Sequence, residues 1–199
     1  MKSKAVVISF LFFIWFVSLP AQTQSNLDVI YRLIQQSVVK VDSILGGKKT
    51  IYISVTSPQL LEALKPKIYQ SFTEHGYILK SSANESDITV NCILTSAGIE
   101  YKNSFSSGLF GGTVLERKAM FAGSYLIVKS NNMIQPFEYA AAKTDTIKLE
   151  EISALENQTL PFTQAKIPAQ PLLTSLLEPI IVVGTLIVTV ILLFTVRGK

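Results

Sequence analysis

Apolar residues recur at helical spacing over residues 27–45. The positions are Leu27, Ile30, Tyr31, Ile34, Val38, Val41 and Leu45. Ser25 and Asn26 stand before this stripe as favourable N-caps, and Gly46-Gly47 follows it as a stop signal. The pattern therefore predicts a surface helix that faces a core, in preference to a coiled-coil partner helix.

A strand and a second helix are predicted next. "TIYISV" places Ile51, Ile53 and Val55 on one side of a strand. The following stripe runs from Leu61 to Phe72 and contains Pro66, which we expect to kink or split the helix. "YILK" then reads as a second, short strand.

The second half of the chain reads as an antiparallel meander. Apolar and polar residues alternate over 87–105, and Gly98 interrupts them as a candidate bulge. A long strand pattern covers 114–129, and a last strand is expected over 134–142, with Pro136 at an edge. The prediction is an α+β fold, with two helices packed on a mostly antiparallel sheet of four to five strands that includes one long hairpin.

The region after the last strand is expected to leave the domain. Ile147, Leu149, Ile152 and Leu155 predict a short acidic amphipathic helix. "LPFTQAKIPAQP" follows with three prolines, and such segments are stiff and extended. We expect this stretch to act as a linker.

The start of the chain has the order of a signal peptide. Lys2 and Lys4 precede an apolar stretch over 5–19, and Pro20 and small residues follow it. Cleavage is expected between Ala21 and Ser25, and no Cys stands there, which excludes lipoprotein processing. The alternative is an uncleaved first membrane helix. Both interpretations place the central part of the chain outside the cytoplasm.

The end of the chain predicts a membrane anchor. Residues 179–196 carry no charge and would extend ~27 Å as a helix, about the thickness of the hydrocarbon core. Pro179 and Val196 bound the run, and Arg197 and Lys199 follow it on the expected cytoplasmic side. Gly184 is a position at which a membrane helix could pack against another. The alternative is a buried core helix or strand.

These observations divide the chain into five parts. They are a signal peptide (1–24), an exported α+β domain (25–157), a proline-containing linker (158–178), a transmembrane helix (179–196) and a cytoplasmic tail (197–199).

Composition argues against nucleic-acid binding. The net charge is +4, but four of the eighteen cations lie in the terminal segments, which leaves fourteen against fourteen acids. The exported domain is therefore neutral and has no basic stripe. Cys92 is the one cysteine, so no internal disulfide can form. An exported domain without disulfides fits a bacterial envelope protein.

No catalytic, metal-binding or cofactor-binding constellation is visible in the sequence. His75 is the one histidine, and its place at a predicted helix C-terminus is sufficiently explained by the helix dipole. Cys92 falls on the apolar side of a strand and is interpreted as a core thiol. Metal sites usually need several His or Cys ligands. We therefore expect no metal, no cofactor and no enzymatic activity.

"GLFGG" marks the tip of the predicted long hairpin. It places Leu109 and Phe110 where apolar side chains are costly to leave in water. They either fold back onto the sheet or form a contact with a partner protein or membrane surface. Leu109 and Phe110 are the candidate partner contact.

The order of elements resembles small α/β domains of bacterial envelope assembly proteins. The stretches that carry the resemblance are "ESDITVNCILTSAGIEY", "ERKAMFAGSYLIVKS" and "MIQPFEYAAAK". They are similar to the curli-secretion family, the flagellar outer-membrane assembly proteins and the amino-terminal domain of TolB. The chain departs from them in lacking a lipidated Cys and a Gly-Glu-Val-x-Trp run, and in its C-terminal membrane helix. The resemblance implies a non-enzymatic interaction domain and no pore.

The expected function is a periplasm-facing interaction or assembly subunit, anchored by a single pass in a bacterial inner membrane. Its partners would be the membrane and an envelope protein, and no nucleic acid. The alternatives are an envelope binding module for a lipid or glycan, and an envelope enzyme.

Overall fold

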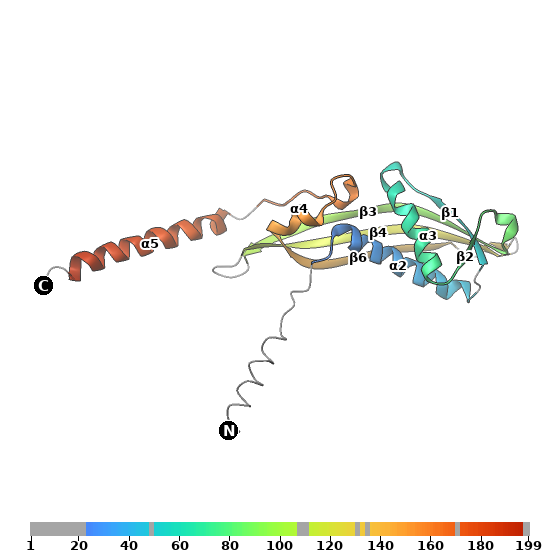
Figure 1. The fold of residues 1–199 in the computed structure, drawn as a ribbon, viewed down its shortest axis with the longest axis horizontal. Coiled ribbons are helices and arrows are strands. Elements are labelled where there is room, and N and C mark those ends of the chain that lie inside the picture. The colour runs from blue at the N-terminus through green and yellow to red at the C-terminus, as the bar shows by residue number, and fades with distance from the viewer. Residues whose placement is uncertain are drawn as a thin grey trace, which may run out of the picture.

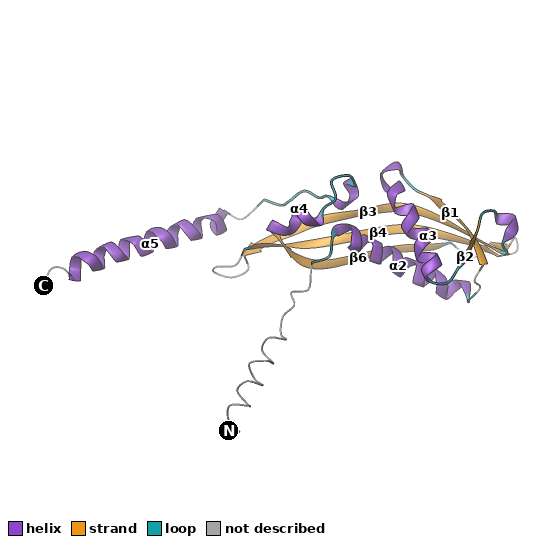
Figure 2. Cartoon of the chain, viewed as in Figure 1, coloured by secondary structure: helices purple, strands orange, loops and turns teal. Residues whose placement is uncertain are grey.

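The computed structural model describes residues 23–47, 50–106, 112–129, 132–133, 136–169 and 172–196. Most of them form one elongated sheet with helices packed against it, while the last helix extends away from this body (Figure 1). Figure 2 distinguishes the helices from the long strands that run the length of the body. The expected signal peptide up to residue 22 lies outside the described residues, as do Leu109 and Phe110.

The first described helix has the limits that the sequence predicts. α2 (Asn26–Leu45) begins after Ser25, whose hydroxyl accepts a hydrogen bond from the Asp28 N–H at 3.1 Å. It ends at Leu45 and is followed by Gly46, which has a φ of 68°. That left-handed conformation costs glycine little, so the backbone can leave the helix there.

Pro66 divides the second helical region, as predicted. β1 (Thr50–Thr56) leads into a 3₁₀ helix, η1 (Gln59–Leu64), and then into α3 (Lys65–Glu74). Pro66 lies in the first turn of α3, where its missing N–H costs no intrahelical hydrogen bond. The short β2 (Ile78–Lys80) and the 3₁₀ helix η2 (Ala83–Glu85) follow.

Among the described residues the sheet has six strands, more than the four to five expected. The remaining strands are β3 (Ile88–Ser106), β4 (Thr113–Lys129), β5 (Asn132–Met133) and β6 (Phe137–Lys148). Their order is β2-β1-β3-β4-β5, and β6 also pairs with β4. β1 is parallel to both β2 and β3, whereas β4 is antiparallel to β3, β5 and β6. The sheet is therefore mixed, with the predicted long hairpin, β3–β4, at its centre.

The predicted bulge at Gly98 is wrong. Gly98 pairs in register with Met120, and the register shifts instead between Leu94 and Ser96. Gly123 lies opposite this shift, and a Cβ added there would be 2.8 Å from the Ile93 carbonyl oxygen. The missing side chain in β4 thus permits the bulge in β3, so the glycine that matters is on the other strand. A second shift occurs at Asn103, which has a φ of 44°.

β6 continues further than the expected end at Ala142. It pairs with β4 from Phe137 opposite Tyr125 to Lys148 opposite Val114. Ile147, which was expected in a helix, is a buried strand residue. The helical region is accordingly short and consists of η3 (Leu149–Glu151) and α4 (Ile152–Leu155).

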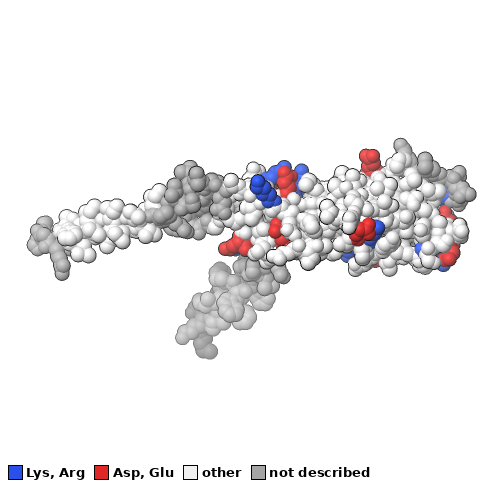
Figure 3. Space-filling view, turned by 90° about the horizontal axis from the view of Figure 1, so that it is seen from above, with Lys and Arg blue, Asp and Glu red and all other residues white. Residues whose placement is uncertain are grey.

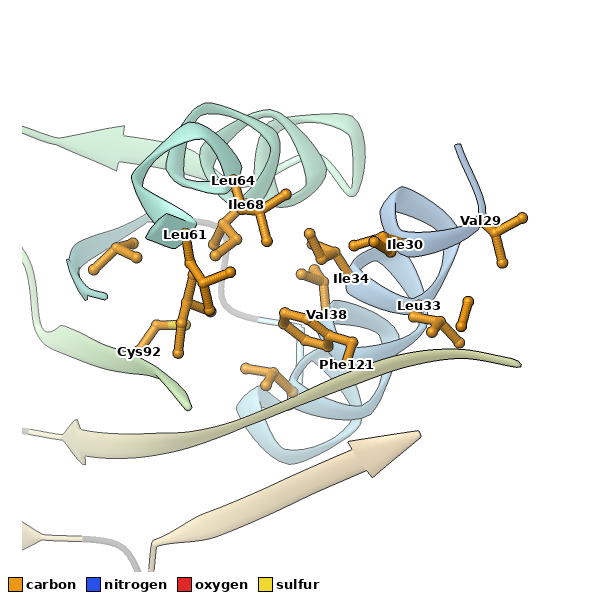
Figure 4. Packing of buried hydrophobic residues seen from close by; sticks show 14 of the residues in the cluster. Val29, Ile30, Leu33, Ile34, Val38, Leu61, Leu64, Ile68, Cys92 and Phe121 are labelled. Carbon is orange, nitrogen blue, oxygen red and sulfur yellow. The ribbon is translucent and has the colours of Figure 1, made fainter. Parts of the chain in front are cut away.

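One face of the sheet carries the core. Side chains from α2 and from the η1–α3 segment converge on strand residues such as Cys92 and Phe121 (Figure 4). Every second residue of β4 between Leu115 and Ile127 is buried. The intervening residues, on the other face, remain partly exposed. We call this second side of β3 and β4 the open face.

The last helix, α5 (Leu172–Val196), includes Pro179 and Gly184 and ends at Val196. Arg197 and Lys199 lie outside the described residues. Within the described residues, no helix is long and apolar enough to cross a membrane.

Candidate functional site

A buried arginine forms the centre of a polar cluster at one end of the covered face. Arg117 points inward from β4 and is 0% exposed. Its Nε and Nη2 donate to the two carboxylate oxygens of Asp145 in β6, at 2.8 and 2.6 Å. This two-point pairing matches the planar guanidinium and holds its orientation.

The third nitrogen of Arg117 reaches the beginning of the body. Nη1 donates to the Gln24 carbonyl oxygen at 2.7 Å and to Asn26 Oδ1 at 2.9 Å. The amide nitrogen of Asn26 in turn donates to the Tyr101 hydroxyl and to the Thr163 carbonyl, both at 2.7 Å. Asn26, at the start of α2, therefore joins β3 and β4 to Thr163, which stands 137 residues further along the chain.

Thr163 lies in the segment 158–178, which the sequence predicts to be a linker. Residues 160–165 instead pack on the body, where η4 (Pro161–Thr163) has Phe162 and Thr163 buried. The Thr163 hydroxyl donates to the carbonyls of Asn157 and Leu160 at 3.0 and 2.8 Å. A buried aromatic side chain and a satisfied hydroxyl outweigh the extended tendency of the nearby prolines.

Further bonds hold the first residues of the body. The Thr23 hydroxyl donates to Glu151 Oε2 at 3.0 Å, and Lys143 Nζ is 3.5 Å from Gln24 Oε1. The N-terminal and C-terminal segments of the body are thus fastened at the same end of the sheet. We call this set the end clamp, defined by Gln24, Asn26, Tyr101, Arg117, Asp145 and Thr163.

The contacts of the end clamp hold chain segments together and are not those of a reactive centre. Burial raises the pKa of Tyr101 to about 12, so its hydroxyl stays protonated at neutral pH. The Arg117 guanidinium is paired with a carboxylate and two oxygen acceptors. Paired charges of this kind stabilise a geometry and offer no unpaired base or nucleophile.

The residues with potential chemistry have structural roles. His75 is the C-terminal cap of α3, and its Nδ1 lies 2.8 Å from the Ser71 carbonyl oxygen. Cys92 is 1% exposed, and burial raises the pKa of its thiol to about 12, as expected for a core thiol. Within the part of the chain that the structure describes, no three His, Cys, Asp or Glu side chains come together as a metal site.

The end clamp was not predicted from the sequence, although one signal for it exists. Arg117 stands between Leu115 and Ala119 on the buried side of the β4 alternation. A charged residue at an inward strand position needs a buried partner, which indicates a network. The sequence does not say that the partners would be Asp145 and Asn26.

No family model and no curated protein matches this chain. Some solved structures share part of its arrangement at low similarity. Rare lipoprotein B from Shewanella oneidensis is 13% identical with a TM-score of 0.35, over 52% of this chain and 75% of that one. A neuraminyllactose-binding hemagglutinin homolog from Helicobacter pylori is 11% identical with a TM-score of 0.34, over 52% and 67%.

A minor lipoprotein from Acinetobacter baumannii is 12% identical with a TM-score of 0.33, over 66% of this chain and 87% of that one. None of these three structures is of the curli-secretion, flagellar or TolB type expected from the sequence. At such TM-scores the likeness supports neither a family nor a function, so the proposals below rest on the chain's own residues.

Proposed function

We propose that this chain is a membrane-anchored, periplasm-facing, non-enzymatic interaction or assembly subunit of a bacterial cell envelope. The observation that carries the proposal is the composition of residues 179–196, in which no residue is charged. The described side chains of this run lie open to solvent, with Val182 63% and Phe194 77% exposed. In Figure 3 the part of α5 drawn in white shows no acidic or basic side chain.

Lipid is the environment that suits such a surface. Leaving apolar area in water costs roughly 25 cal/mol per Å², and a helix so uniformly apolar has no polar side to turn outward. As a continuous helix, the uncharged run 179–196 of the sequence would extend ~27 Å, about the thickness of the hydrocarbon core. Arg197 and Lys199 would then lie on the cytoplasmic side, in agreement with the positive-inside tendency.

The end clamp supports a defined orientation of the body. Because it fastens Gln24 and Thr163 together, the chain enters and leaves the body at one end of the sheet. The segment that leads to α5 starts there, so this end would face the membrane. The β3–β4 hairpin projects from the same end, since Ser106 and Thr113 lie beyond Arg117. Leu109 and Phe110, which stand between these two strands in the sequence, remain our proposed contact for an envelope partner close to the bilayer.

Membrane extraction and protease accessibility test the proposal together. We expect the full-length chain to stay in the membrane pellet after sodium carbonate treatment. Protease added to spheroplasts should digest the body and leave a C-terminal epitope tag protected. As a matched pair, Leu186→Arg/Val190→Arg should release the chain from the pellet, whereas Leu60→Arg, at an exposed position on η1, should not.

A wild-type chain that is soluble after lysis would contradict the anchor. A body protected from external protease would contradict the periplasmic orientation.

A further inference from the structure

The outward side of β4 has an unexpected composition for a surface in water. A strand with one face in water normally alternates apolar with polar residues. β4 instead places Val114, Met120, Ala122, Leu126 and Val128 on the open face, opposite the core. Glu116, Lys118 and Ser124 lie on the same face, so five of the eight open-face positions of β4 from Val114 to Val128 are apolar, where a face in water is normally polar.

Charges on the open face follow a regular order. Glu100 of β3 pairs with Lys118 of β4, and the next open-face pair reverses the signs, with Lys102 opposite Glu116. Lys102 Nζ also lies 3.1 Å from Glu100 Oε2 along β3. Acid and base thus alternate both along each strand and across the two strands.

This order makes the open face complementary to itself. Consider a twofold axis that is parallel to the strands, lies between two facing sheets and passes midway between β3 and β4. Such an axis would place β3 of one copy over β4 of the other. Glu100 would then face the second copy's Lys118, and Lys102 would face the second copy's Glu116. Each charge meets the opposite sign, which is the arrangement that favours a specific partner.

The sizes of the neighbouring residues agree with the same axis. Gly98 and Met120 are paired in register, and a Cβ at Gly98 would meet no atom within 4 Å. Met120 would therefore enter the space above the second copy's Gly98. At the end of the hairpin, Phe105, which is 47% exposed, would face the second copy's Val114.

We propose that the open face is a docking surface for a second copy of this chain, with the two sheets packed face to face. Sheets packed in this way lie about 10 Å apart, within reach of these side chains. An axis along the strands leaves the end clamps of both copies at the same end. Both anchors could then enter one membrane, whereas antiparallel pairing of two β6 edges would direct them to opposite ends.

The contact is of moderate size. With the axis between β3 and β4, these two strands overlap, and two strands by eight open-face positions cover roughly 500 Å² per copy at the usual strand and residue spacings. This is below the ~800 Å² per partner of a standard interface. Anchoring in one membrane raises the effective concentration and would favour the pair. The complementarity itself does not need the anchor, so this inference and the proposed function can fail separately.

Charge reversal in trans tests the proposal. Two differently tagged full-length chains are co-expressed, solubilised in detergent and purified through one tag. We expect wild-type copies to co-purify. When both copies carry Lys118→Glu, or both carry Glu100→Lys, co-purification should fall about tenfold because like charges meet. One Lys118→Glu copy with one Glu100→Lys copy should restore it, since both cross-copy contacts again join opposite signs.

The control is an exposed pair away from the open face, Glu62 and Lys65, which lie 2.7 Å apart. Reversing either of these charges should leave co-purification unchanged. Met120→Arg is a second variant, which leaves the core untouched and should also abolish co-purification. Circular dichroism confirms that each variant folds. The inference would be overturned if wild-type copies did not co-purify, or if the mixed pair co-purified no better than two copies of the same variant. The first result would also be expected if another protein covered this face.

Discussion

At the scale of single residues, Arg117 holds together parts of the chain that are distant in sequence. Its guanidinium is fully buried and makes four hydrogen bonds, to Asp145, Gln24 and Asn26. A buried cation of this kind stabilises the fold only while its partners remain in place. The free energy of unfolding should therefore respond sharply to its removal.

Arg117→Met should lower the free energy of unfolding by about 3 kcal/mol, because it leaves a part-buried carboxylate and two oxygen acceptors without their donor. Lys65→Met removes the cation of an exposed pair with Glu62 and should have a much smaller effect, because water screens an exposed pair. Urea titrations of the detergent-solubilised full-length chains, followed by circular dichroism, measure both. Equal effects of the two substitutions would show that the end clamp does not contribute as argued.

At the scale of elements, the β3–β4 pairing depends on one small residue. Gly123 lies where the register of β3 shifts, and the carbonyl of Ile93 occupies the space that a side chain would need. Gly98 pairs in register with Met120 and has open space around it. An added methyl group should therefore be poorly tolerated at Gly123 and better tolerated at Gly98.

Gly123→Ala should lower the free energy of unfolding by about 1–3 kcal/mol, since the backbone of β3 must move to admit the new Cβ. Gly98→Ala should cost less than Gly123→Ala, because within one copy the added methyl group meets no atom within 4 Å and alanine loses less chain entropy. The same urea titrations separate the two. A tolerated Gly123→Ala would mean that the bulge can form without the missing side chain.

At the scale of the whole molecule, the packed body reaches further than the expected domain end at 157. The Ala165 N–H donates to Glu156 Oε1 at 3.1 Å, and Phe162 is buried. Lys166, by contrast, is exposed and outside any helix or strand. The boundary between body and linker therefore lies near residue 165.

Limited trypsin digestion of the detergent-solubilised chain should cut after Lys166 before it cuts within β6. Proteases need a locally open backbone, which a paired strand does not offer. Mass spectrometry of the first fragments identifies the cut. Cleavage after Lys143 or Lys148 at a similar rate would indicate that β6 and the segment after it open together.

The elements that the sequence determined by itself are those with a strong local period. α2, β1 and β4 follow from the spacing of their apolar residues, because each turn or pleat returns a side chain to the same face. The split at Pro66 and the stop at Gly46 likewise depend on the backbone of one residue.

Tertiary structure decided what depends on contact through space. The parallel direction of β1, the bulge opposite Gly123, the extension of β6 to Lys148 and the partners of Arg117 all join residues far apart in the chain. A periodic pattern states which side of an element is buried but carries no information on what it meets there. The neighbours that complete a hydrogen bond or fill a space are chosen only when the chain packs.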